Sequence, residues 1–142
     1  MSRAPARRFE DVDVWKKAHA WVLGVYRFSD GFPKHEAFGL RAQLRDAAVS
    51  VPGNFAEGFK RRTVKDKARS YNIAQSSLEE SRYFLILSQD LGYGDATALR
   101  EDAEEIARML NAYLVSLSRG SSRSEKRRDP ATVHRFPEAD VL

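Results

Sequence analysis

The chain has 142 residues, of which 42% are hydrophobic and 31% charged, a composition typical of one soluble globular domain. It contains no cysteine and only three isolated histidines, which excludes disulfides and thiolate metal sites and predicts a cytoplasmic protein without a bound metal or other cofactor. The formal net charge is +4, and no apolar run is long enough to span a membrane, so we expect no membrane partner.

Helical spacing of apolar side chains predicts a first helix over residues 11–29, with Asp11 or Asp13 as its N-cap. One apolar stripe is formed by Trp15, Ala18, Val22 and Val25. A second stripe repeats every seven residues at Val14, Trp21 and Phe28, so the apolar arc is wider than one bundle seam needs. We therefore predict that this second stripe is exposed and forms an interface between copies of the chain, unless Trp21 covers the edge of the bundle.

Apolar spacing over residues 35–60 predicts a second helix with a proline in its middle. Pro52 has no N–H, so the carbonyl of Ala48 loses its helical partner, and we expect a kink because the apolar spacing continues on both sides. Asn54 could bond a backbone group that the kink frees, and Glu57 is expected to join that polar network or to pair with a nearby arginine, Arg45 or Arg61. The structural motif at the kink comprises Pro52, Asn54, Glu57 and Gly58.

A third helix is predicted over residues 63–91, with a capping signal at Thr63, and a fourth over residues 95–118. Residues 119–142 are polar and basic, which predicts a flexible C-terminal tail, and residues 1–10 form a basic N-terminal arm. The fold expected for residues 11–118 is an all-α, antiparallel up-down four-helix bundle, because four amphipathic helices are joined by short connections.

The charge of the predicted bundle is segregated although it sums to zero. Between residues 60 and 69 the local charge is +5, and the basic residues are Lys60, Arg61, Arg62, Lys65, Lys67 and Arg69. Five acids and two arginines between residues 95 and 108 give a local charge of −3. We predict that this basic cluster binds the phosphates of a nucleic acid; the alternatives are that it meets an acidic surface of a partner or of another copy, or remains a solvated helix end.

Chemistry other than binding has weak support in the sequence. Glu57 and Asp46 could form the carboxylate pair of a metal-dependent nuclease, but a structural role for Glu57 beside Asn54 is favoured. Ser50 has no histidine and aspartate placed to form a catalytic triad. We therefore predict no catalytic residue and a protein that is not an enzyme.

Several segments resemble those of a known family. They are DVDVWKKA at residues 11–18, the Phe32-Pro33 pair, GLRAQLRDAAVSVPGNFAEG at residues 39–58, the turn at Tyr93 and RMLN at residues 108–111. The chain resembles, over about residues 9–118, the four-helix bundle protein family, also called 23S rRNA intervening-sequence proteins. The accessory variability proteins of diversity-generating retroelements are relatives. The family's usual serine before Asn54 is replaced here by Gly53.

The resemblance implies a bacterial four-helix protomer that assembles as a ring-like homopentamer and has no enzymatic activity. For relatives encoded in retroelements, the resemblance implies a protein that binds a reverse transcriptase and nucleic acid, RNA or DNA, through a positive surface. The alternative is a protein–protein interaction module that binds no nucleic acid.

Overall fold

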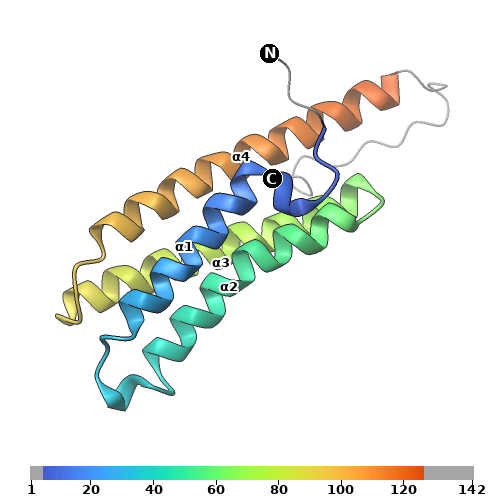
Figure 1. The fold of residues 1–142 in the computed structure, drawn as a ribbon. Helices are drawn as coiled ribbons and strands as arrows, with labels where there is room; N and C mark the ends of the chain where they lie inside the picture. The colour runs from blue at the N-terminus through green and yellow to red at the C-terminus, as the bar shows by residue number, and fades with distance from the viewer. Residues whose placement is uncertain (1–4, 127–142) are drawn as a thin grey trace.

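The computed structural model describes residues 5–126, and the side chains through residue 120. Within these residues the chain is all-helical (Figure 1). The elements are η1 (Phe9–Asp11), α1 (Asp13–Ser29), η2 (Lys34–Glu36), α2 (Leu40–Lys60), α3 (Val64–Asp90) and α4 (Thr97–Lys126). In the bundle α1 packs against α2 and α4, and α3 packs against the same two helices. The prediction of four helices without strands is confirmed, whereas their antiparallel order and a kink at Pro52 stay predictions.

The first helix begins two residues later than predicted, and its expected cap is wrong. The N-cap residue of α1 is Val12, which offers no side-chain hydrogen bond. The Asp11 carboxylate instead accepts from the backbone N–H of Arg8 at 3.2 Å, at the start of the short η1 turn. Asp11 therefore stabilises the turn that leads into α1 rather than α1 itself.

The second helix begins at Leu40, five residues after the predicted start at residue 35. Gly39 takes a non-helical conformation, with φ −108° and ψ −117°, and separates η2 from α2. A carboxylate oxygen of Glu36 accepts from the Leu40 N–H at 3.2 Å, which satisfies an amide of the first helical turn. The break is therefore stabilised by a side chain that the hydrophobic pattern does not reveal.

The ends of α3 are those that the sequence predicts. Thr63 caps the helix, because its hydroxyl accepts from the Asp66 N–H at 3.1 Å. At the other end Gly92 has a φ of +81°, and its N–H donates to the Gln89 carbonyl at 3.0 Å. The Tyr93 N–H donates to the Ser88 carbonyl at 2.9 Å, which completes a Schellman motif.

The fourth helix extends to Lys126, beyond the predicted end at residue 118. Residues 119–126, which the sequence assigned to the tail, are therefore helical. Once a helix is nucleated, each further residue adds a hydrogen bond at little cost, so a polar sequence can continue it. The rest of the predicted tail, residues 127–142, and residues 1–4 of the predicted arm lie outside the described residues.

The prediction that Val14, Trp21 and Phe28 form an exposed stripe is wrong. Val14 and Trp21 are only 4% and 2% exposed, and Phe28 is half-buried with its ring 5.4 Å from that of Phe32. The Trp21 indole N–H donates to the Leu99 carbonyl at 3.0 Å. Because α1 contacts both α2 and α4, one protomer uses the whole apolar arc.

The large apolar side chains that remain exposed lie elsewhere. Among the described residues they are Leu23, Tyr26, Phe38, Val49, Ile73, Tyr83, Ile86 and Leu91. None of the helices in the described part of the chain combines the length and the apolar character needed to cross a bilayer.

Candidate nucleic-acid interface

The basic cluster is carried by the end of α2, the connection at residues 61–63 and the start of α3. The two helices approach closely here. A Cβ atom on Gly58 would lie 2.7 Å from a ring carbon of Tyr71 and 2.9 Å from the Ser70 Cβ. The rings of Phe55 and Tyr71 stack below, with centroids 5.0 Å apart. The basic residues therefore stand on a tightly packed corner of the bundle.

Other basic groups gather at the same end of the bundle. Figure 1 shows the start of α1 and the last turns of α4 at the end where α2 connects to α3. The short η1 turn contacts α2 as well as α1. Arg7, Arg8 and Arg119 are exposed on these segments. Arg119 thus adds positive charge at this end, whereas Arg7 and Arg8 are balanced by the neighbouring Glu10 and Asp11.

Four of the six basic residues of the cluster are exposed and have no ion pair with any other described side chain: Lys60, Arg62, Lys65 and Arg69. We call these four residues the basic platform. Lys65 and Arg69 lie one helical turn apart on α3 and border an open depression of about 450 Å³. Asn72 and Ser76 also line this depression; they carry no charge, so the charge pattern of the sequence does not reveal them.

The remaining two basic residues are engaged within the protomer. Arg61 is exposed but forms an ion pair with Glu57, 2.6 Å between Nη2 and Oε1, one of the two pairings that the sequence left open. Lys67 is half-buried and donates from Nζ to the carbonyls of Gly58 and Phe59 at 3.2 and 2.8 Å. Burial lowers the pKa of Lys67 from its ordinary value. The structure thus separates Lys67 from the platform.

The structural motif around Pro52 links α2 to α3. The Asn54 amide donates to the Ser50 carbonyl at 2.9 Å and to the Ser50 hydroxyl at 2.8 Å. It does not bond the carbonyl of Ala48, the group that lacks a partner because of the proline. The Ser50 hydroxyl lies 2.7 Å from that of Ser77 on α3, so the network joins the two helices.

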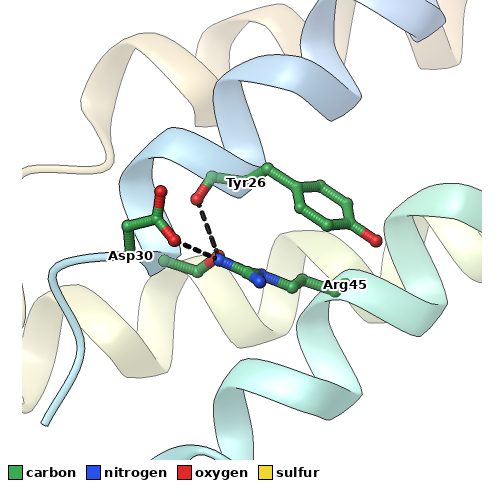
Figure 2. A network of polar contacts seen from close by, with 4 residues as sticks. Tyr26, Asp30 and Arg45 are labelled. Atoms are coloured by element: carbon green, nitrogen blue, oxygen red, sulfur yellow. Dashed lines mark hydrogen bonds and ion pairs between the residues drawn. The ribbon is translucent and has the colours of Figure 1, made fainter.

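The other arginine considered for Glu57, Arg45, has a structural role at the end of α1 (Figure 2). Its guanidinium donates to the Tyr26 carbonyl at 3.1 Å, to Asp30 at 2.8 Å and to the Ser29 hydroxyl at 2.8 Å. It also lies 4.5 Å from the centroid of the Tyr26 ring. A cation at the carbonyl end of a helix is favoured by the helix dipole.

The predicted acidic cluster of α4 is partly neutralised inside the protomer. Lys17 of α1 lies 3.1 Å from Glu105 and 3.6 Å from Asp102, and the hydrogen bond to Glu105 is the main cause that raises the pKa of Lys17. Arg82 of α3 lies 3.3 Å from Glu104. Three of the five acids thus pair with cations of neighbouring helices of the same protomer.

The carboxylates considered for a nuclease are not gathered into such a site among the described residues. Glu57 is engaged by Arg61, and no group of three or more histidine, aspartate or glutamate residues in this part of the chain is placed to hold a metal ion. The basic corner of the described chain therefore presents exposed cations beside polar side chains, with the acidic Glu80 also lining the depression.

Comparison with known proteins places the chain in a family. A search of curated proteins found no match. The family description "23S rRNA-intervening sequence protein" matches residues 10–112, which include α1, α2, α3 and the first half of α4. This match covers well over half of the 142 residues and agrees with the four-helix architecture. The chain therefore belongs to the 23S rRNA-intervening sequence protein family.

Proposed function

We propose that the protein is a non-enzymatic, homo-oligomeric scaffold that binds nucleic acid through the basic platform. The observation that carries the proposal is the presence of four exposed cations, Lys60, Arg62, Lys65 and Arg69, on one packed corner. Exposed lysines and arginines bind phosphates by releasing the counterions of the nucleic acid. We also propose that the four helices form an up-down bundle and that α2 bends at Pro52.

Binding of this kind is directed at the backbone and tolerates different sequences. Base reading on single strands relies on exposed aromatic rings, on which bases stack. The aromatic residues nearest the platform are engaged elsewhere, since Tyr71 is buried and Phe59 lies under Lys67 with its centroid 5.6 Å from Nζ. We therefore propose that RNA and DNA are held by their phosphates.

For the assembly we propose a ring, pentameric as the resemblance implies, whose subunits meet at the boundary of α1 and α2. Leu23 and Val49 are each 45% exposed, and Tyr26 is 39% exposed. Leu23 and Tyr26 are three residues apart on α1, and Tyr26 covers Arg45, which is four residues from Val49 on α2. These three residues replace Val14, Trp21 and Phe28 as the proposed interface. A ring repeats the platform and strengthens its field.

The proposal also includes a protein partner. Where the chain is encoded beside a reverse transcriptase, that enzyme is the partner we expect from the resemblance. The alternative function, a protein-interaction module without nucleic acid, would pair the platform with the acids of α4 on a neighbour. It is disfavoured because Lys17 and Arg82 already engage three of those acids.

The test is a salt titration of binding to RNA and DNA duplexes of the same length. The platform variant replaces Lys60, Arg62, Lys65 and Arg69 by alanine. We expect the slope of log affinity against log salt for DNA to fall by about 0.9 for each phosphate that the variant no longer neutralises. Equal retention of both nucleic acids by this variant and the wild type would contradict the proposal.

A matched control removes the same charge from other surfaces. It replaces four exposed cations that lie outside the platform, namely Lys16, Arg27, Lys34 and Arg108. We expect this variant to keep most of the salt slope, because net charge alone does not create a local site. An equal loss of affinity in the control and platform variants would show attraction by net charge rather than by the platform.

A further inference from the structure

Lys67 stands apart from the basic residues around it because its ammonium faces the end of α2. The last carbonyls of a helix lack intrahelical partners, and cations are favoured there. Lys67 Nζ lies 2.8 Å from the Phe59 carbonyl and 3.2 Å from the Gly58 carbonyl. The Gly58 carbonyl also accepts from the Arg61 N–H at 3.1 Å. The ammonium and the first amide of the connection therefore share one acceptor.

The connection at residues 61–63 is held at its other end by Thr63, which caps α3 through the Asp66 N–H. Between these two anchors lies Arg62, and Lys60 and Lys65 flank them. Two of the four platform residues, Lys60 and Lys65, thus lie directly beside a backbone group that Lys67 or Thr63 bonds. Lys67 is the anchor that joins the end of α2 to α3.

We propose that Lys67 is a positioning residue of the basic platform: it fixes the end of α2 against α3, so that the platform cations are presented together, and it does not contact phosphate itself. This inference rests on the proposed function. Cations that are already arranged bind with a smaller ordering cost. Two of the ammonium donors are engaged by carbonyls, and the half-buried stem limits their reorientation.

The experiment compares Lys67→Met with Lys65→Met, which removes an exposed lysine two residues away on the same helix. Binding of an RNA duplex is measured over a range of salt concentrations. We expect Lys67→Met to weaken binding roughly threefold to tenfold with an unchanged salt slope, because the ordering cost rises while the phosphate contacts remain. Lys65→Met should lower the slope of log affinity against log salt by roughly the amount that one phosphate contact contributes. Lys67→Arg keeps a cation near the carbonyls and should restore most of the affinity.

A second measurement needs no nucleic acid. Hydrogen exchange at the Arg61 amide should accelerate in Lys67→Met and stay unchanged in Lys65→Met, since only the former loses the bonds that hold the last turn of α2, which carries the acceptor of that amide, against α3. A salt slope lowered as much as in Lys65→Met would overturn the inference, because Lys67 would then touch phosphate. Unchanged affinity or unchanged exchange in Lys67→Met would also overturn it. Failure of the wild type to bind RNA would contradict the proposed function. Unchanged exchange at the Arg61 amide in Lys67→Met would contradict this inference alone.

Discussion

Two glycines of α2 differ in what a side chain would meet. A Cβ on Gly58 would lie 2.7 Å from the Tyr71 ring, whereas a Cβ on Gly53 has no atom within 4 Å. We expect Gly58→Ala to lower the free energy of unfolding by about 1–3 kcal/mol, because the ring and α3 must move. Gly53→Ala should raise it by about 0.5–1 kcal/mol, because glycine is a poor helix former.

Urea unfolding of the two variants measures both changes in the same helix, five residues apart. Gly53→Ala serves as the control for adding a methyl group to α2. If Gly58→Ala were as stable as Gly53→Ala, the close approach of the two helices at the platform would be wrong.

The polar contacts that could be foreseen are those within one helix or turn. Thr63 with Asp66 and Glu57 with Arg61 are three and four residues apart, so the spacing alone brings them together. The role of Lys67 could not be foreseen, since its acceptors belong to the preceding helix. The same holds for the Trp21 indole, whose acceptor is far away in the sequence. Such contacts depend on how the helices pack.

At the scale of elements, one carboxylate joins η2 and the start of α2 to the connection after α3. Glu36 accepts from the Tyr93 hydroxyl at 2.8 Å and from the Leu40 N–H at 3.2 Å. The hydrogen bond from Tyr93 is the main cause that lowers the pKa of Glu36 from its ordinary value of 4.5. The unfolded chain therefore binds the proton more tightly, so the hydrogen bond stabilises the fold above the ordinary pKa, and this stabilisation disappears as the pH falls through the lowered one.

We expect Tyr93→Phe to be less stable than the wild type at neutral pH, with a difference that shrinks between about pH 5 and pH 3 as Glu36 is protonated. Urea midpoints across this range measure the effect. Tyr83→Phe is the control. Tyr83 is 57% exposed, so the effect on stability of removing its hydroxyl should not depend on pH in this range. A stability difference for Tyr93→Phe that stays constant down to pH 3 would contradict the assignment.

The existence of each helix follows from the sequence, but three boundaries do not: the starts of α1 and α2 and the end of α4. Apolar spacing sets the interior of a helix, whereas its ends depend on individual hydrogen bonds. The late start of α2 depends on Gly39 and the Glu36 carboxylate. The long α4 continues beyond its apolar stripe, because a polar helix needs only its own backbone hydrogen bonds to extend.

At the scale of the molecule, the sequence predicts the fold class and the basic cluster. It does not predict correctly which apolar side chains the protomer leaves exposed. The stripe of Val14 and Trp21 suggested an interface because the apolar arc of the first helix is wider than one bundle seam needs. Because α1 packs against both α2 and α4, Val14 and Trp21 are buried within the protomer. Surface available for assembly must therefore be sought among the side chains that the protomer leaves exposed.

Assembly can be tested on the exposed boundary of α1 and α2. Leu23→Ser with Val49→Ser removes apolar surface from the proposed interface, and Phe38→Ser with Leu91→Ser removes it from exposed sites elsewhere. We expect light scattering to give several times 16.1 kDa for the wild type and for the Phe38 and Leu91 control, and about 16.1 kDa for the interface variant.

The interface variant should also bind nucleic acid roughly tenfold to a hundredfold more weakly, although its platform is unchanged, because linked copies of one site bind with higher avidity than a single copy. The variant should remain folded, since Leu23 and Val49 are 45% exposed in the protomer, and its thermal midpoint should fall only by the stabilisation that assembly adds. A wild-type mass of one subunit would refute the ring, and an interface variant that stays assembled would move the subunit interface away from α1 and α2. Loss of assembly without loss of affinity would mean that each protomer binds nucleic acid independently.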